Sequence, residues 1–168
     1  GEGAMRGTAM FKPDDVFDEG PTLRVIGRPV QVLYFGHSSG RGDIAVLDVL
    51  NGVLFAGGLV DHLRVPDVQD SELPGWRRAL DALRGLPLRF VVPGHGPVAP
   101  PSSIETTQRY LDQLEARVLE LLRSGAALSD VPDSANLPEF KHSDQYDIIH
   151  RRNASVLFVR MEREQMFK

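Results

Sequence analysis

The sequence contains no cysteine, which excludes disulfides and metal sites built from thiolates. It also has no apolar run near the ~18 residues that a membrane-spanning helix needs, so we expect no membrane partner. Lys and Arg, 19 in all, are outnumbered by 23 Asp and Glu, and the net charge is -4. That balance argues against a nucleic-acid partner. With membranes and nucleic acids excluded as partners, we expect a small-molecule substrate.

The composition is that of an ordinary globular domain, with 42% hydrophobic and 25% charged residues in 168. The chain opens Gly1-Glu2-Gly3-Ala4, with neither an initiator methionine nor a secretory signal. We therefore expect a chain that has been cut, tagged or processed.

Strand-forming runs dominate the first hundred residues, after an irregular lead-in predicted for residues 1–22. Residues 30–35 predict a strand covered on both faces. Residues 44–50 and 53–56 flank Asn51-Gly52, which predicts a hairpin with a type I′ turn. Residues 88–92 predict a buried strand that Pro93-Gly94 ends.

Helical periodicity appears between and after these strands. Trp76, Leu80 and Leu83 share one face of a helix that Asp70 or Ser71 caps and Gly85 ends. A longer helix carries an apolar stripe and ends near Gly125; its stripe is Ile104, Thr107, Leu111, Leu114, Val118 and Leu121. Ser102 and Glu105 have capping-box spacing at its start.

The last part of the chain predicts a broken segment over 126–142 and a helix over 143–167, with His142 and His150 in solvent. Strands and helices in this order predict an α+β domain, with helices covering a mostly antiparallel or mixed sheet. We divide the chain into the lead-in 1–22, a domain 23–125, and a linker with C-terminal helix, 126–168, packed on the same domain.

Three glycine-containing loops, 36–43, 57–62 and 93–98, each follow a strand and carry His or Asp. Loops at one edge of a sheet are where functional sites are usually built, so we expect these three to meet. His95, held between Gly94 and Gly96, is the strongest candidate, because flanking glycines allow close backbone approach.

Several motifs together resemble the C-terminal half of a metallo-β-lactamase-fold hydrolase, from about residue 20 to about residue 125. Within that superfamily the chain is most similar to the quinoprotein relay system zinc metallohydrolases. The motifs are Tyr34-Phe35-Gly36 with Arg41-Gly42-Asp43, the run Val53-Leu54-Phe55-Ala56-Gly57-Gly58-Leu59-Val60, Arg64-Val65-Pro66, the Trp76 helix, and Val91-Val92-Pro93-Gly94-His95-Gly96-Pro97-Val98.

This resemblance implies an αββα sandwich with one or two metal ions, usually zinc. A metal-bound hydroxide would cleave an ester, thioester or amide bond in a small-molecule substrate. It also implies a periplasmic location.

The sequence departs from the family pattern at three places. The His-x-His-x-Asp-His cluster of the N-terminal half is absent. Ser39 stands where the family has a ligand histidine, and Gly58 where it has the carboxylate that bridges two metals. His95 alone matches a ligand position.

Other residues are assigned lesser roles. His37 and Asp61 are the candidate replacement ligands. Asp43 and Ser39 are expected to fix their loop, and Arg64 and Asp67 to face a substrate.

Two functions remain open. In the first, the intact protein is a hydrolase with a reduced metal site, and zinc is absent or weakly bound in this chain, which is inactive alone. Its apolar sheet face would then need the missing N-terminal half or a second copy in a homodimer. In the second, the protein is a non-catalytic binding or accessory module on a degenerate metallo-β-lactamase fold.

Overall fold

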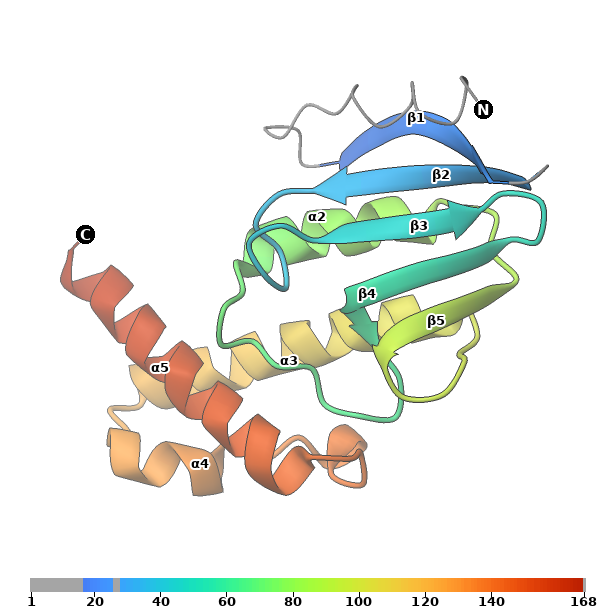
Figure 1. Cartoon of the computed structure of the whole chain (residues 1–168). Coiled ribbons are helices and arrows are strands. Elements are labelled where there is room, and N and C mark those ends of the chain that lie inside the picture. The colour runs from blue at the N-terminus through green and yellow to red at the C-terminus, as the bar shows by residue number, and fades with distance from the viewer. Residues whose placement is uncertain (1–16, 26–27, 168) are drawn as a thin grey trace.

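The computed structural model describes residues 17–25 and 28–167, and these form a five-stranded sheet with helices (Figure 1). The strands follow one another across the sheet in chain order: β1 (Phe17–Val25), β2 (Arg28–Phe35), β3 (Ile44–Asp48), β4 (Val53–Asp61) and β5 (Phe90–His95). The first three pairings are antiparallel and β4 pairs with β5 in parallel. The sheet is therefore mixed, as the sequence predicts.

The predicted irregular lead-in is wrong for residues 17–22, which belong to β1. The β1–β2 register shifts between Glu19 and Thr22, and the intervening Gly20-Pro21 lies at this irregularity. A strand at the sheet edge accepts a proline and a bulge because one of its sides needs no ladder hydrogen bonds. Residues 1–16 of the lead-in lie outside the described residues.

The β3–β4 hairpin is confirmed, but its turn is not type I′. Four residues, 49–52, connect the strands, and only Gly52 has a positive φ, +63°. A type I′ turn requires positive φ at both central residues. Instead the Asp48 carboxylate accepts hydrogen bonds from the backbone N and Nδ2 of Asn51, at 3.3 and 2.9 Å, and this contact organises a longer turn.

Helices α2 (Leu73–Arg84) and α3 (Ser102–Arg123) lie against one face of the sheet, behind it in Figure 1. The predicted stripes of both helices are buried, and Gly85 and Gly125 stand at their C-terminal ends. Arg77 joins the two helices by donating to Asp112 and Glu115 at 2.8 and 2.9 Å.

Both predicted helix caps are wrong. Glu72 caps α2, because its carboxylate accepts from the backbone N of Gly75. Helix α3 starts after Pro101 without a side-chain cap. Ser71 Oγ instead donates to Val68 O at 2.6 Å, and Ser102 offers its carbonyl to Thr106. The start of α2 is also held from outside the helix, because Glu72 N donates to Ser38 O at 2.8 Å.

The C-terminal part confirms the predicted final helix. Short helical turns at Leu128–Asp130 and Pro138–Phe140 flank α4 (Val131–Ser134). A π-helical turn, Tyr146–His150, then leads into α5 (Arg151–Met166). No helix among residues 17–25 and 28–167 is long and apolar enough to cross a membrane.

His150 is buried rather than solvated, with 1% of its surface exposed. Its Nε2 lies 2.7 Å from Ala135 O and its Nδ1 2.8 Å from the Tyr110 hydroxyl, and its ring stacks on Tyr146. A carbonyl can only accept, so Nε2 carries the proton and Nδ1 accepts from Tyr110. Burial lowers the pKa of His150, which favours this neutral form.

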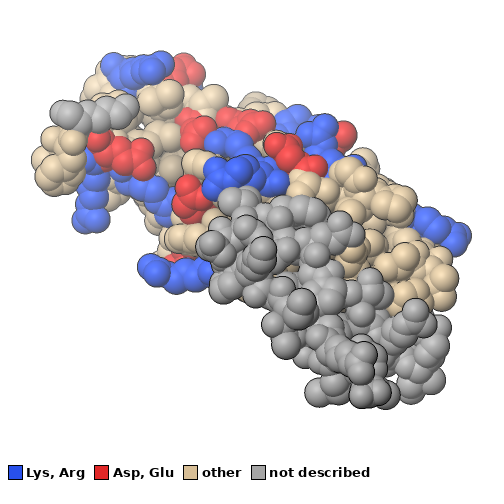
Figure 2. Space-filling model, turned by 90° about the horizontal axis from the view of Figure 1, so that it is seen from above, with Lys and Arg blue, Asp and Glu red and all other residues tan. Residues whose placement is uncertain are grey.

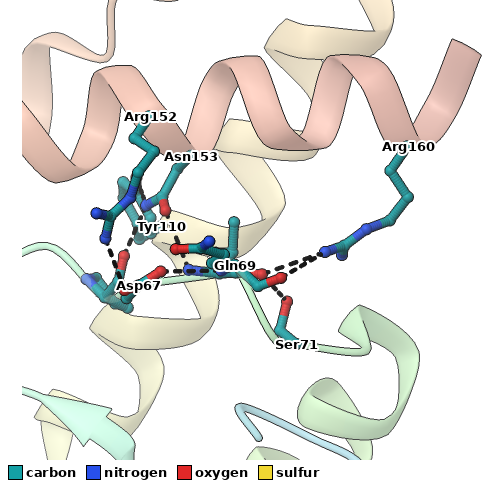
Figure 3. Close-up of polar contacts among 9 residues, drawn as sticks. Asp67, Gln69, Ser71, Tyr110, Arg152, Asn153 and Arg160 are labelled. Carbon is teal, nitrogen blue, oxygen red and sulfur yellow. Dashed lines mark hydrogen bonds and ion pairs between the residues drawn. The ribbon is translucent and has the colours of Figure 1, made fainter.

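Asn153, on α5, holds the segment that links β4 to α2 (Figure 3). Its Oδ1 accepts from Val68 N at 3.0 Å, and its Nδ2 donates to Pro66 O at 2.7 Å and to the Tyr110 hydroxyl at 2.9 Å. Arg160 of the same helix donates to Gln69 O at 3.2 Å. Helix α5 thereby fixes the segment that links the end of β4 to α2.

The other face of the sheet is apolar and is not covered by the described residues. Ile44, Phe55 and Phe90 are 49%, 47% and 49% exposed. They share this face with half-buried residues in register with them: Tyr34 opposite Ile44, Val46 opposite Phe55, Val92 beside Phe55, and Val53 beside Phe90. Figure 2 shows the molecule from above and not this face; on the described part of that view acidic and basic side chains are interspersed, with no large area of one sign.

Candidate functional site

The parallel pairing of β4 with β5 brings Asp61 and His95 together where both strands end. Asp61 Oδ1 lies 3.0 Å from the backbone N of His95 and 3.2 Å from its Nδ1. An ionised carboxylate only accepts, so Nδ1 donates, and in the neutral imidazole Nε2 is the nitrogen with a free lone pair. One carboxylate therefore fixes both the backbone and the imidazole of His95.

Burial differs between the two partners. The Asp61 side chain is 7% exposed, whereas that of His95 is 56% exposed. Burial raises the pKa of Asp61, and the neighbouring His95 opposes this shift. A carboxylate behind an outward-facing imidazole is the arrangement that orients a histidine for ligation or proton transfer.

Glycines allow the loops at this edge to touch. A Cβ at Gly94 would lie 2.6 Å from Gly57 O, and one at Gly96, where φ is +105°, would lie 2.0 Å from His62 O. No side chain fits at either distance. The segments 57–62 and 93–98 meet as predicted, but not as loops: β4 continues through Asp61 and β5 through His95, so Pro93-Gly94 does not end the strand.

The third loop, 36–43, joins them through Ser39. A Cβ at Gly58 would lie 3.0 Å from Ser39 Oγ. Asp43 Oδ2 accepts hydrogen bonds from Ser38 Oγ at 2.7 Å, from the backbone N of Ser39 at 2.8 Å, from Ser39 Oγ, and from Gly40 N at 3.1 Å. Asp43 and Ser39 thus hold the loop in shape.

The remaining candidates lie apart from the Asp61–His95 pair. His37 Nε2 lies 2.7 Å from Asp70 O, ahead of α2. Asp67 accepts hydrogen bonds from Arg152 at 2.8 Å and from Gln69 N at 2.9 Å. It therefore connects the segment between β4 and α2 to α5 (Figure 3). Arg64 makes no hydrogen bond or ion pair with its side chain among the described residues and lines a cavity beside Asp61.

Zinc requires three or four protein ligands. Within residues 17–25 and 28–167, no group of three or more His, Cys, Asp or Glu side chains could hold a metal ion. Ser39 and Gly58 contact each other at the two positions where the resemblance implies ligands. The described residues therefore do not form a zinc site by themselves.

Sequence reasoning treated Asp61 as a replacement ligand and missed its role as the partner of His95. Each residue follows glycines at the end of its strand, which was the available signal. The missing information was the parallel register that pairs positions 34 residues apart.

Comparison with known proteins gives one curated relative of clear significance. The chain is 26% identical over 106 residues to a metallo-beta-lactamase type 2 of Bacteroides fragilis, a match covering 60% of this chain and 43% of that protein. No family model matches the chain. The chain thus spans less than half the length of this curated relative.

Solved structures give the same result. A metallo-beta-lactamase from Pontibacter korlensis aligns over 65% of this chain and 54% of its own, with 26% identity and a TM-score of 0.52. A metallo-beta-lactamase family protein from Thermus thermophilus aligns over 86% of this chain and 48% of its own, with 22% identity and a TM-score of 0.60. The chain has the fold of half a metallo-β-lactamase domain, and its relatives support membership of the metallo-β-lactamase superfamily.

Proposed function

We propose that the intact protein is a hydrolase of the metallo-β-lactamase fold that cleaves an ester, thioester or amide bond, and that this chain contributes His95 and Asp61 to its active site. The observation that carries the proposal is the contact of His95 Nδ1 with the buried Asp61 carboxylate at 3.2 Å. Nothing else at this sheet edge presents an oriented imidazole among the described residues.

The residues of the pair have separate tasks. Asp61 holds the backbone N and Nδ1 of His95, which leaves Nε2 of the neutral, 56% exposed ring as the nitrogen that could bind a metal ion. The carboxylate would then fix the orientation of the ring as a ligand. Hydrolysis by metal-activated water, as in the related family, requires ligands from outside the described residues.

The finer assignments belong to this proposal as well. The resemblance of Val91–Val98 and of the β4 segment favours the quinoprotein relay system zinc metallohydrolase group, and with it a periplasmic location. The open apolar face favours a second layer, supplied by an N-terminal half or by a second copy of the chain. The first source is supported by relatives longer than this chain, of whose length the matched regions cover 43% and 48%.

The test uses the intact protein and a generic ester, p-nitrophenyl acetate, with a thioester as second substrate. We expect His95→Ala to abolish turnover and Asp61→Asn to reduce it. His142→Ala, an exposed histidine on the turn before α5, is the matched control and should leave turnover unchanged. Equal turnover in wild type and His95→Ala contradicts the proposal.

The chain of 168 residues gives a further test, because we expect it to be inactive alone. Turnover by this chain that disappears on adding a chelator contradicts the conclusion that its metal site is incomplete. Zinc content measured by mass spectrometry on the same samples separates loss of metal from loss of activity.

A second candidate, a non-catalytic binding or accessory module, is favoured by Ser39 and Gly58, which lie close together at the two positions where the resemblance implies metal ligands. The Ser39 hydroxyl donates to Asp43 instead, and glycine has no side chain to bind zinc. Stoichiometric zinc in the intact protein that is lost in His95→Ala supports the hydrolase. Absence of zinc from both proteins supports the binding module.

A further inference from the structure

A cavity of about 250 Å³ lies next to Asp61, between the segment that follows β4 and the first turns of α3. The turn over 139–143 closes its third side. Its volume is below the ~300–1,000 Å³ of sites that hold drug-sized ligands, so the cavity suits a small molecule. Its apolar walls include Leu63, Pro66 and Phe140.

One buried polar group in this cavity has no partner. Ser103 lines the cavity and is 2% exposed, and its Oγ makes no hydrogen bond among the described residues. A buried hydroxyl without a partner costs roughly 1–3 kcal/mol, so such groups are uncommon unless a ligand or water satisfies them. The Ser103 hydroxyl can therefore donate a hydrogen bond to a ligand in the cavity.

Arg64 is the basic residue of the same cavity. Its side chain is half-buried and forms no hydrogen bond or ion pair with the described residues, and its positive charge partly opposes the rise that burial causes in the pKa of Asp61. Its backbone is held in place, because Asp144 N donates to Leu63 O at 2.9 Å and Val65 N donates to Asp144 O at 3.0 Å. The guanidinium therefore extends from a fixed segment.

The acidic groups of the cavity are already occupied. Asp61 binds His95, and Glu139 accepts from Arg109 and from Gln113, at 2.8 and 2.9 Å. The first turn of α3, a helix of 22 residues, adds the positive end of its dipole. The groups left for a ligand are one guanidinium, one hydroxyl and this helix start.

We propose that this cavity binds a small monocarboxylate, with Arg64 as its counter-ion, Ser103 as a hydrogen-bond donor, and an apolar tail against Leu63, Pro66 and Phe140. A single negative charge is favoured over a phosphate dianion because Asp61 and Glu139 also line the cavity and repel additional charge. The site makes no use of the imidazole of His95, and it stands independently of the proposed hydrolase activity.

The test is an NMR titration of the ¹⁵N-labelled full chain with sodium butyrate, with inorganic phosphate and n-butanol titrated in parallel. We expect saturable shifts at the amides of Ser103 and Thr106 and at Arg64 Nε with butyrate. We expect little response to phosphate or to butanol, which lacks the charge. Tighter binding of phosphate, or equal binding of butanol, overturns the carboxylate assignment, and no saturable shift with butyrate overturns the site.

Variants locate the binding groups. Arg64→Gln should weaken butyrate binding by about tenfold, because it removes a charge-assisted hydrogen bond. Ser103→Ala should weaken it by about threefold, the effect of a hydrogen bond from a neutral donor. Arg123→Gln, at the far end of α3, and Ser155→Ala, on α5, are the matched controls and should bind like the wild type.

The two cavity variants are expected to fold, because neither side chain makes a hydrogen bond within the described protein. Circular dichroism and thermal unfolding check this directly. Ser103→Ala should be at least as stable as the wild type, since it removes a hydroxyl without a partner. Wild-type butyrate affinity in both folded variants contradicts the proposal.

Discussion

The two faces of the sheet have the same apolar character but different surroundings. On the face toward α2 and α3, Leu54 and Val91 are fully buried. On the other face, their neighbours Phe55 and Phe90 are about half exposed. A sheet with two apolar faces belongs between two layers, and the described chain provides one of them. The described polypeptide therefore has one complete core, between the sheet and its helices, and a second apolar sheet face that no described residue covers.

The largest expected effect separates adjacent residues on the two faces. Leu54→Ala should lower the free energy of unfolding by about 2–5 kcal/mol, because it leaves a cavity in the helix-covered core. Phe55→Ala should cost much less, since its ring is already 47% exposed. Urea denaturation followed by circular dichroism measures both. Similar losses for the two variants would show that the open face is covered in solution.

The covered side also depends on the polar contacts of Asn153. Asn153→Ala should destabilise the chain by about 1–3 kcal/mol, because it leaves Val68 N and Pro66 O buried without these partners. Asn136→Ala, at an exposed asparagine before the Pro138–Phe140 turn, is the control and should change stability little. Urea denaturation of both variants tests this, and a neutral Asn153→Ala would contradict the assigned role of the network.

A smaller effect, confined to acid, is expected from His150. Burial lowers its pKa below the ordinary 6.5, so the unfolded chain binds this proton at a higher pH than the folded chain. The free energy of unfolding should therefore fall as the pH drops below about 6.5 and should be insensitive to this group at higher pH. Thermal unfolding over a pH series measures the slope.

The control for this prediction is a second histidine on the same part of the chain. His150→Asn should remove this group's share of the acid-induced loss, whereas His142→Asn, at an exposed position, should keep the wild-type slope. An unchanged slope in His150→Asn would show that His150 titrates alike in the folded and unfolded chain.

The last effect is expected on self-association, from polar substitutions on the open face. Phe55→Ser combined with Phe90→Ser should reduce self-association, because less apolar surface remains to be buried. Each substitution should cost less stability than Leu54→Ala, since both rings are already about half exposed. Sedimentation velocity over a range of concentrations measures the oligomeric state. Unchanged association in this variant would place the contact between copies elsewhere.

Much of the fold was predictable because its signals are local. The apolar stripe from Ile104 to Leu121 fixed a helix, and the β-rich runs on either side of Asn51-Gly52 fixed a hairpin. Errors occurred where another contact outweighed the expected signal. Two of these contacts are local: Asp48 binds Asn51 and reshapes the hairpin turn, and Glu72 binds Gly75 N and replaces the expected caps of α2. The third is the pairing with β2, which makes residues 17–22 part of a strand.

The candidate site was predictable as a place but not as a set of contacts. The glycines around His95 and in the second half of β4 indicated where backbones meet, since close backbone approach requires them. Which side chains would touch could not be predicted from spacing alone. His37 binds Asp70 O, and Asp67 binds Arg152, because each lies beside an element far away in sequence.

By itself, the sequence determined the periodic elements, the absence of thiolate chemistry and the glycine-bearing loops, because these depend on residue types at short spacing. Only the tertiary structure decided that Asp61 supports His95, that His150 points inward, and that Arg64 and Ser103 share a cavity. The physical reason is that strand register and helix packing set these pairs, and a shift of one residue along β5 would separate all that now meet at the sheet edge.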